Sequence, residues 1–504
     1  KPSENMHLIV NKKILILTSL LGVVFIISGF VLGYRVFPNL VEKKVWENVI
    51  LTENTEQWTN FMKIPFPFQI KVCFFNVSNP DQILQGAKPI VKEVGPYVYD
   101  LYRWRNDIEW NDDEISFYEY TSLEFNRKAS GKLSDNDLVT ILNLPLNALI
   151  MTVEQMFPDA LETVDSVISI MFGEYDGLFI TASVRKLLFS GQIICKDGGD
   201  ADFAAKIICT QFKNKAKLSR PMQIVDQHID YAYLRYKNHT HLGRFTINTG
   251  QKVRENVWNL VKYENKEYIS VWNGQKSICN KIHGSIMFPP FLTKNMTFDL
   301  FAEDICRHMP LKYNDTDTVK GIQGYRFTVP KNAFNRPTKD SPDYCYCTNR
   351  SPDLNGRRSG CLGDGILDMT TCVGAPIILS FPHLLYADPN YRSSVEGLKP
   401  SEQLHSTFAT VEPISGAPLQ MAKRVQFNMF VRPVLDITFL ENVSNSLMPV
   451  FWIEESVTLS DDKIDLLKNL LLKNLKKLTI VQWVIIGLGM AAVFVSVALI
   501  LHQL

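Results

Sequence analysis

The sequence predicts a mixed α+β membrane protein in which two transmembrane helices flank one large ectodomain. Two stretches of the 504-residue chain, 14–34 and 478–501, contain no charged residue. Each is long enough to cross a hydrocarbon core about 30 Å thick at about 1.5 Å of rise per helical residue. Between them, several short segments alternate apolar and polar residues, which is typical of half-buried β-strands. One long segment has its apolar residues at helical spacing instead.

The charge balance excludes a polyanion-binding protein, and we expect no nucleic-acid partner. The chain has 53 basic and 52 acidic residues, a net charge of +1, whereas nucleic-acid binders carry a concentrated basic surplus. Charged residues make up 21% and aromatic residues 11% of the chain, which also excludes a largely disordered protein.

We interpret the first apolar segment as an uncleaved signal anchor. A cleaved signal peptide is the alternative, but its apolar region is usually about 7–15 residues long and precedes a small-residue cleavage site. Here the apolar run extends to Tyr34 and is followed by Arg35. We therefore expect five parts: a cytoplasmic tail (1–13), a transmembrane helix (14–34), an ectodomain (35–477), a second transmembrane helix (478–501) and a cytoplasmic tail (502–504).

Lysines near the spans do not settle the side of the ectodomain, because those before the first span and those before the second argue in opposite directions. Glycosylation sequons and cysteines favour the extracellular side. Five sequons lie between the spans, at Asn76, Asn238, Asn295, Asn314 and Asn442. Six of the nine cysteines cluster late in the ectodomain: Cys279, Cys306, Cys345, Cys347, Cys361 and Cys372.

An even, clustered set of cysteines is what an oxidising compartment produces. A zinc site is the alternative interpretation. However, Cys345 and Cys347 are not a C-x-x-C pair, and no histidine lies at ligand spacing. The sequence therefore favours disulfides and an extracellular or luminal ectodomain.

Local patterns predict the elements of the ectodomain. Strict alternation over 68–74 predicts a half-buried strand, and shorter alternations predict strands near 115–117, 123–125 and 427–431. Residues 135–190 have apolar residues at helical spacing, so we expect a helical insertion there. Residues 201–218 predict another helix that begins near Asp202.

The stalk before the second span predicts a helix that continues into the membrane. Ser460 is placed to cap it, acidic residues fill its first turn and lysines its last, which complements the helix dipole. In the spans, Gly29 and Gly33 form a G-x-x-x-G motif, and Gly487 and Ala491 a similar small-residue pair. Such pairs allow close packing of the two spans, or of two copies of the chain.

No motif in the sequence indicates catalysis. The chain contains no G-x-S-x-G, H-E-x-x-H, P-loop or EF-hand pattern. His228, His239 and His241 form the densest histidine group, for which a surface or strand role is favoured over metal ligation. The acidic segment 104–114 is typical of a solvated hairpin, rather than of a glycosidase carboxylate pair. We therefore expect no enzyme, no catalytic residue, no metal site and no cofactor.

Several segments together resemble the class B scavenger receptor family, which includes fatty acid translocase and the lysosomal integral membrane protein. These segments are 75–80 (FNVSNP), 93–99 (EVGPYVY), 187–191 (LLFSG), 288–290 (FPP), 304–307 (DICR), 380–383 (SFPH), 395–400 (VEGLKP), 412–416 (EPISG) and 423–428 (KRVQFN). The chain is most similar to the insect sensory neuron membrane proteins, on the grounds of 423–428, 451–455 (FWIEE) and the extra pair Cys195 and Cys209. It departs from the family's usual Gly-Thr-Asp-Gly at 284–287, which here reads Gly-Ser-Ile-Met.

The resemblance implies an antiparallel β-barrel core with a helical bundle head at 135–190 and a hydrophobic tunnel. It implies a receptor that binds hydrophobic small molecules, either fatty-acid-derived pheromones or lipids, and passes them to the membrane or to an odorant receptor complex. The implied location is the plasma membrane of chemosensory neurons, in their dendrites or cilia. The alternative is a general scavenger receptor or fatty-acid uptake protein in other tissue.

Two further classes of function are alternatives to this one. A lipid hydrolase tethered to the membrane is disfavoured because the nucleophile and metal motifs are missing. The other class is a trafficking or scavenger receptor that binds a protein or lipoprotein partner. The acidic residues of the expected head disfavour anionic lipoproteins, although Arg185 and Lys186 weaken that argument.

The resemblance also implies a disulfide pairing, which the residues alone leave open because six cysteines allow fifteen connectivities. It gives Cys279–Cys345, Cys306–Cys372 and Cys347–Cys361. Apart from the resemblance, Cys195 and Cys209 are a candidate pair for a fourth bond across the segment 197–200. Cys73 then remains as an unpaired thiol on the polar-facing side of its strand. No tunnel-lining ligand residue is assigned from the sequence.

Overall fold

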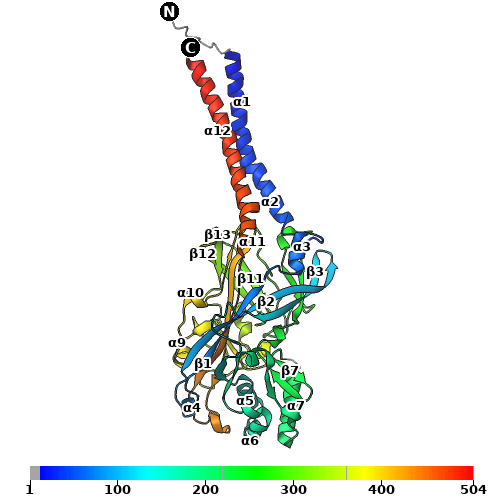
Figure 1. The fold of residues 1–504 in the computed structure, drawn as a ribbon, viewed down its shortest axis with the longest axis vertical. Helices are drawn as coiled ribbons and strands as arrows, with labels where there is room; N and C mark the ends of the chain where they lie inside the picture. The colour runs from blue at the N-terminus through cyan, green and yellow to red at the C-terminus, as the bar shows by residue number, and fades with distance from the viewer. Residues whose placement is uncertain (1–11, 218, 359, 503–504) are drawn as a thin grey trace, which may run out of the picture. The chain divides into compact units, whose positions relative to one another are not determined.

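The computed structural model describes residues 12–217, 219–358 and 360–502. Residues 1–11 and 503–504, in the two expected tails, lie outside this range. The described residues form two compact units (Figure 1). The helical unit comprises residues up to Ile50, Lys320–Ile322 and the residues from Leu459 onwards. The large unit comprises Leu51–Val319 and Gln323–Thr458.

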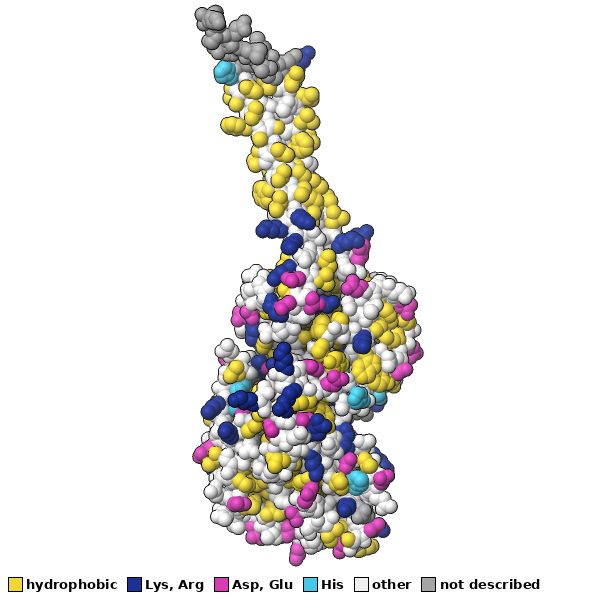
Figure 2. Space-filling model, in the orientation of Figure 1, with side chains coloured by type: hydrophobic (Ala, Val, Ile, Leu, Met, Phe, Trp, Pro, Cys, Tyr) yellow, Lys and Arg dark blue, Asp and Glu magenta, His cyan; other side chains and the backbone are white. Residues whose placement is uncertain are grey.

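Two long apolar helices make up most of the helical unit. The first is α1 (Lys12–Val31), which continues through a π-helical turn into α2 (Phe37–Glu47). The second is α11 (Asp461–Leu467), which continues through another such turn into α12 (Lys473–His502). Both are long and apolar enough to cross a membrane. Hydrophobic side chains dominate the visible face of their upper part, and Lys, Arg and acidic side chains follow below it (Figure 2).

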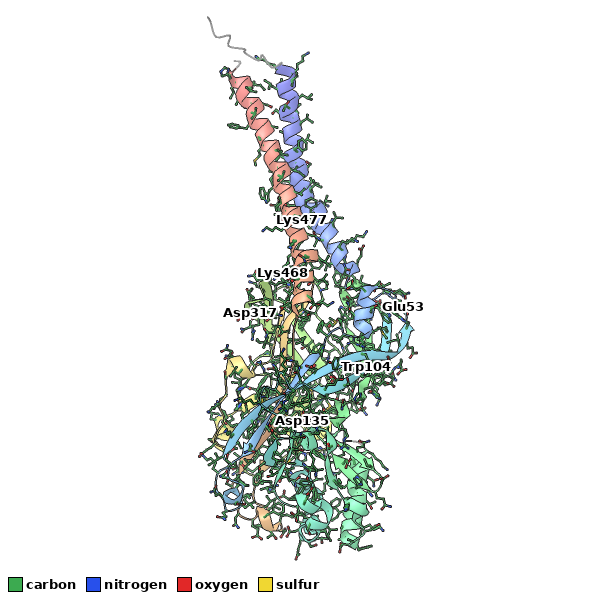
Figure 3. The ribbon with its side chains drawn as sticks, viewed as in Figure 1. Glu53, Trp104, Asp135, Asp317, Lys468 and Lys477 are labelled. Carbon is green, nitrogen blue, oxygen red and sulfur yellow. A yellow bond between two sulfur atoms is a disulfide. The ribbon has the colours of Figure 1, made fainter. Side chains whose placement is uncertain are left out.

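The stalk prediction is confirmed in its main feature and wrong in one detail. Stalk and span form one helix, on which both Lys468 and Lys477 lie (Figure 3). The Ser460 hydroxyl makes no capping hydrogen bond with the first turn. Instead, the Ser460 carbonyl oxygen accepts the Ile464 N–H at 2.9 Å.

Helices α1 and α12 pack against each other through glycines. A Cβ atom added to Gly22 would lie 2.7 Å from the Gly489 carbonyl oxygen, and the reverse distance is also 2.7 Å. The predicted Gly29 and Gly33 do face α12, but Gly487 does not face α1. Nothing among the described residues lies within 4 Å of a Cβ built there. Two residues along a helix are about 200° apart, so Gly487 and Gly489 lie on different faces.

A large antiparallel sheet forms the centre of the large unit. Its strand order is β10-β9-β3-β2-β1-β18-β17-β16-β13-β12-β11. The bounds are β1 (Phe68–Val77), β2 (Val91–Asn111), β3 (Glu114–Phe125), β9 (Thr240–Asn248), β10 (Leu260–Tyr263), β11 (Thr297–Ala302), β12 (Arg307–Val319), β13 (Ile322–Thr328), β16 (Phe408–Val411), β17 (Pro418–Val431) and β18 (Ser446–Thr458). Strands β14 (Ile366–Asp368) and β15 (Ile378–Ser380) extend it beside β17. The strands predicted at 115–117, 123–125 and 427–431 are confirmed within β3 and β17.

The two ends of this sheet lie on either side of one loop. The Leu260 N–H donates to the Gly284 carbonyl at 2.9 Å, and the Ser285 N–H donates to the Asp299 carbonyl at 3.0 Å. Gly284 has φ +87°, and a Cβ there would lie 2.1 Å from the Asp299 oxygen, so only glycine fits. Among the described residues no hydrogen-bonded pair joins β10 to β11. The sheet therefore curls towards a barrel, but the closed barrel that we expected is not formed by strands.

The helical head predicted at 135–190 is correct only in its middle. Helices α5 (Leu144–Met156) and α6 (Leu161–Phe172) form there, but strands β4 (Leu138–Leu142) and β5 (Phe179–Ser183) flank them and pair with each other. The five residues of β4 have apolar side chains three and four positions apart, a spacing that fits a short buried strand as well as a helix. The pairing of β4 with β5, which lies about 40 residues further along the chain, selects the strand.

The helix predicted at 201–218 is confirmed as α7 (Phe203–Ala216). Its N-cap is Asp202, whose Oδ1 accepts hydrogen bonds from the backbone N–H groups of Ala204 and Ala205. The strands that precede and follow α7 in the sequence form a small sheet in the order β6 (Gln192–Ile194), β8 (His228–Tyr231) and β7 (Met222–Val225). The remaining helices are α3 (Glu56–Met62), α4 (Pro80–Ile83), α8 (Thr370–Val373), α9 (Pro389–Ser393) and α10 (Glu402–His405).

Strand β1 is buried more fully than its alternation predicts. Val72, Cys73, Phe74 and Phe75 are all buried, so both faces of the strand are covered there. The expectation that Cys73 faces the polar side is therefore wrong: it is 2% exposed and unpaired. The reason is its place in the sheet, because β1 pairs with both β2 and β18 in the middle of the strand order.

Candidate functional site

Two cavities in the large unit are lined mainly by apolar side chains. The first, called the sheet cavity, has a volume of about 190 Å³ and lies inside the curl of the large sheet. Strands from both ends of the strand order contribute to its wall, including β3, β9, β11, β12, β16 and β17. Its apolar wall includes Phe68, Phe117, Phe245, Ile286, Leu300, Phe301, Met309, Phe408, Met421 and Val425.

The second, called the head cavity, has a volume of about 130 Å³. Helix α5 supplies part of its wall. The rest comes from the segment around β7 and β8, the turn at Asp304, the segment 372–377 and strands β17 and β18. Its apolar wall includes Leu144, Pro145, Ala148, Met222, Leu234, Ile377, Phe427, Phe451 and Ile453.

The two cavities follow one another along the inner face of β17 and β18. On β18, Ile453 lines the head cavity and Glu455 the sheet cavity. On β17, Phe427 lines the head cavity and Val425 the sheet cavity. Residues two apart point to the same face of a strand and are separated by about 7 Å. The cavities are therefore neighbours, although they share no lining residue.

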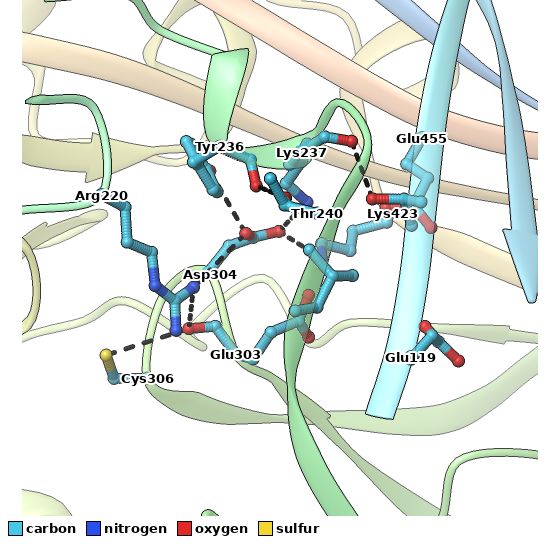
Figure 4. Close-up of polar contacts among 12 residues, drawn as sticks. Glu119, Arg220, Tyr236, Lys237, Thr240, Glu303, Asp304, Cys306, Lys423 and Glu455 are labelled. Atoms are coloured by element: carbon cyan, nitrogen blue, oxygen red, sulfur yellow. Dashed lines mark hydrogen bonds and ion pairs between the residues drawn. The ribbon is translucent and has the colours of Figure 1, made fainter. Parts of the chain in front are cut away.

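A cluster of charged side chains lies where the linings of the two cavities meet, and Figure 4 shows its contacts. We call it the polar boundary, and its members are Arg103, Glu119, Arg220, Lys237, Glu303, Asp304, Lys423 and Glu455. The turn between β11 and β12 supplies Glu303 and Asp304. Glu303 lines the sheet cavity and Asp304 lines the head cavity, so the boundary passes between two consecutive residues.

Asp304 is the centre of this cluster. Its Oδ2 lies 2.5 Å from Lys237 Nζ and 3.6 Å from Lys423 Nζ, and its Oδ1 lies 3.8 Å from Arg220 Nη1. Tyr236 adds a hydrogen bond to Oδ1 at 3.3 Å. Although burial opposes ionisation, Lys237, Lys423 and Arg220 hold the pKa of Asp304 well below its usual range.

The adjacent carboxyl group behaves in the opposite way. Burial and the neighbouring Asp304 carboxylate raise the pKa of Glu303. Apart from its own backbone N–H, no hydrogen-bond or ion-pair partner of the Glu303 side chain is found in the described part of the chain. The turn therefore holds two different carboxyl groups: basic side chains compensate the charge of Asp304, whereas Glu303 has no such ion pair among the described residues.

Ion pairs complete the polar boundary on the sheet side. Lys423 and Glu455 are directly opposite each other on β17 and β18. Arg103 Nη2 lies 2.5 Å from Glu455 Oε1. Although burial opposes it, Arg103, Lys423 and Lys237 lower the pKa of Glu455 to about 2.

Away from the polar boundary, a group of three side chains among the described residues has the spacing of metal ligands. Ligand atoms of Glu93, His383 and His405 lie within 4.8 Å of one another. However, the Nδ1 atoms of both histidines accept backbone N–H groups at 3.0 Å, from Lys399 and Ser401. Each neutral ring must then carry its proton on Nε2, where a metal would bind. Glu93 instead accepts hydrogen bonds from His383 Nε2 and, at 2.9 Å, from Trp452 Nε1. The geometry therefore fits a structural hydrogen-bond cluster.

The cysteines form four disulfides: Cys195–Cys209, Cys279–Cys345, Cys306–Cys372 and Cys347–Cys361. The last three coincide with the pairing that the resemblance implies, and the first joins the separate candidate pair. Cys306–Cys372 ties the end of the Glu303–Asp304 turn to Cys372, which lines the head cavity. It thus fixes one wall of that cavity to the polar boundary.

The other residues named from the sequence lie in different places. Asn295, Asn314 and Asn442 are exposed, whereas Asn76 and Asn238 are half-buried and use their side-chain oxygens to accept backbone N–H groups. His228, His239 and His241 do not converge on a common point with metal-ligand spacing. Trp104 projects from β2 (Figure 3) and stacks on Tyr120 of β3, in the hairpin expected for the acidic segment.

The sequence did not single out the cavity walls or the polar boundary. A signal for two of its members does exist in the strand pattern. Lys423 shares a strand face with Val425 and Phe427, and Glu455 shares one with Ile453 and Phe451. A charge at the end of an otherwise apolar face marks a polar group directed towards the core.

Comparison with known proteins shows similarity over nearly the whole chain. The model of the CD36 family matches residues 20–500. Sensory neuron membrane protein 2 of Drosophila melanogaster is 31% identical, over 94% of this chain and 96% of its own length. Sensory neuron membrane protein 2 of Anopheles gambiae is 31% identical over 93% and 90%. Sensory neuron membrane protein 1 of Apis mellifera is 31% identical over 92% and 88%.

Proposed function

Because the chain belongs to the CD36 family, we propose that it is a non-enzymatic membrane receptor and transfer protein for lipid-like ligands. The observation that carries this proposal is the pair of consecutive apolar cavities along β17 and β18. We further propose that the spans are residues 14–34 and 478–501, within the two long helices, and that residues 35–477 are extracellular.

An enclosed apolar path suits ligands that are poorly soluble in water. Moving a buried methylene group into water costs about 0.8 kcal/mol, so a long-chain odorant is held far better between apolar walls. The sheet and head cavities supply such walls within one unit. In this proposal the protein binds fatty-acid-derived pheromones or other lipids and releases them to the membrane or to an odorant receptor.

The proposed location is the dendritic or ciliary membrane of sensory neurons. The names of the similar insect proteins support this location. A general scavenger receptor or fatty-acid uptake protein is the second candidate. Antibody staining of tissue for this protein distinguishes the two candidates, since a signal restricted to gut or fat cells would favour the second.

Binding without turnover is the first expected result. The purified full-length chain, reconstituted in lipid nanodiscs, should show saturable binding of a long-chain ester, aldehyde and fatty acid. Mass spectrometry of the extracted ligand should show unchanged mass. An ester hydrolysed or an aldehyde oxidised by the pure protein would contradict the non-enzymatic assignment.

Glycosylation provides a test of the proposed topology. We expect glycosidase treatment of the cell-expressed chain to lower its apparent mass. Replacing the exposed Asn295, Asn314 and Asn442 by Gln should remove most of that shift, because their side chains are free of the backbone contacts that hold Asn76 and Asn238. Replacing all five should abolish it. An unchanged band before mutation would contradict an extracellular ectodomain.

A further inference from the structure

Two side chains of the polar boundary keep unused hydrogen-bonding capacity towards the sheet cavity. Lys423 and Glu303 both line that cavity. The Lys423 ammonium has one ion-pair contact in the described part of the chain, with Asp304 Oδ2 at the long distance of 3.6 Å. An ammonium group carries three N–H donors, so donors remain available. The Glu303 carboxyl group has no partner there beyond its own backbone N–H.

The surroundings of these two groups define the chemistry that they would recognise. Burial and Asp304 raise the pKa of Glu303, which favours its neutral form with an O–H donor. When it is protonated, Glu303 offers an O–H donor beside the Lys423 ammonium, and these two groups then match an oxygen that only accepts hydrogen bonds. The walls on either side are apolar and match an alkyl chain. A polar atom left without a partner in such a site is costly.

We propose that Glu303 and Lys423 form a polar subsite that binds the carbonyl oxygen of a long-chain lipid at the boundary between the two cavities. This inference rests on the proposed function and deepens it, because it names the ligand class and its orientation. The carbonyl group of an ester, aldehyde or acid lies against Glu303 and Lys423, and the alkyl chain lies in the flanking cavities. A plain hydrocarbon leaves both donors unpaired, so it binds more weakly.

The arrangement of the neighbouring charges explains why Lys423, rather than Lys237, serves this role. Lys237 is 7% exposed, and it is held at 2.5 Å by Asp304. Lys423 is 30% exposed and its contact with Asp304 is looser. Asp304 keeps Lys237, Arg220 and Tyr236 as partners when Lys423 turns towards a ligand.

Competition photolabelling of the full-length chain in nanodiscs tests the subsite. A photoreactive hexadecyl acetate is displaced by hexadecyl acetate, hexadecanoic acid or hexadecane, and the half-displacing concentrations are compared. We expect K423M and E303L each to weaken the two carbonyl compounds by about ten-fold, the size of one hydrogen bond to a charged or buried group, without changing displacement by hexadecane. E303Q keeps a donor and should stay within about two-fold of the natural chain. The ester and the acid arms identify which carbonyl class is preferred.

A matched control separates the subsite from a general loss of charge. Lys331 pairs with Glu402 at 2.8 Å on the exposed surface, so K331M should change none of the three concentrations. The ratio of ester to hydrocarbon within one variant is unaffected by partial unfolding, because the same folded fraction binds both. An unchanged ratio in K423M and E303L would overturn the subsite and leave the proposed function standing. Failure of the natural chain to take up any lipid would overturn both.

Discussion

Replacing Asp304 by Asn is expected to lower the free energy of unfolding by about 3–5 kcal/mol, the usual cost of removing one partner of a buried ion pair. Asp304 is 12% and Lys237 7% exposed, and their charged atoms lie 2.5 Å apart. The Asn side chain keeps the shape but removes the charge that compensates Lys237, Lys423 and Arg220. The expected result is a large loss from an isosteric change.

Chemical denaturation of the full-length chain, followed by tryptophan fluorescence, measures this loss. The matched control is Glu402→Gln, which removes the exposed partner of Lys331 and should cost less than about 1 kcal/mol. If Asp304→Asn is as mild as the control, Asp304 does not compensate a buried charge.

The polar boundary should also make the free energy of unfolding depend on pH in the acidic range. The pKa of folded Glu455 is about 2, below the value of 4.5 for an unperturbed Glu. A carboxyl group whose folded pKa is lowered stabilises the fold above its unfolded pKa, and this stabilisation is lost as the pH falls through the folded value. We therefore expect stability to decline between about pH 4.5 and 2, and Glu455→Gln to flatten that decline.

Removing the Cys306–Cys372 disulfide is expected to be comparably damaging. The bond joins residues 66 apart in sequence, and the chain-entropy model then gives a loss of about 4 kcal/mol for the Ser–Ser double variant. It also frees the turn that carries Glu303 and Asp304. We expect a lower unfolding midpoint and reduced yield of folded protein from cells.

The shorter Cys347–Cys361 bond offers the control for this experiment. It joins residues 14 apart, so its removal should cost about 3 kcal/mol, less than that of the longer loop. Equal losses in the two double variants would show that loop length does not set the cost. Non-reducing peptide mapping of the natural chain checks the pairing, and a Cys279–Cys306 peptide would contradict it.

The sequence by itself determined the features that depend on short stretches of chain. Both membrane-length helices follow from local hydropathy, and α7 begins after Asp202 because one side chain caps its own first turn. The strand segments at 115–117, 123–125 and 427–431, within β3 and β17, follow from alternation that a few neighbours establish. In each case the residues that decide the outcome are adjacent in the chain.

Only the tertiary structure decided the features that depend on distant segments. Leu138–Leu142 is a strand because β5 pairs with it, and Cys73 is buried because β1 lies between β2 and β18. Gly489 rather than Gly487 contacts α1 because the rotation of α12 selects one face. The polar boundary joins Lys237, Asp304 and Lys423, which lie on separate elements that the curl of the sheet brings together. The periodicity of apolar residues indicates which face of a helix or strand is buried, but not which other element covers that face. The covering elements supply the charges and contacts of a site, so only the tertiary structure defines it.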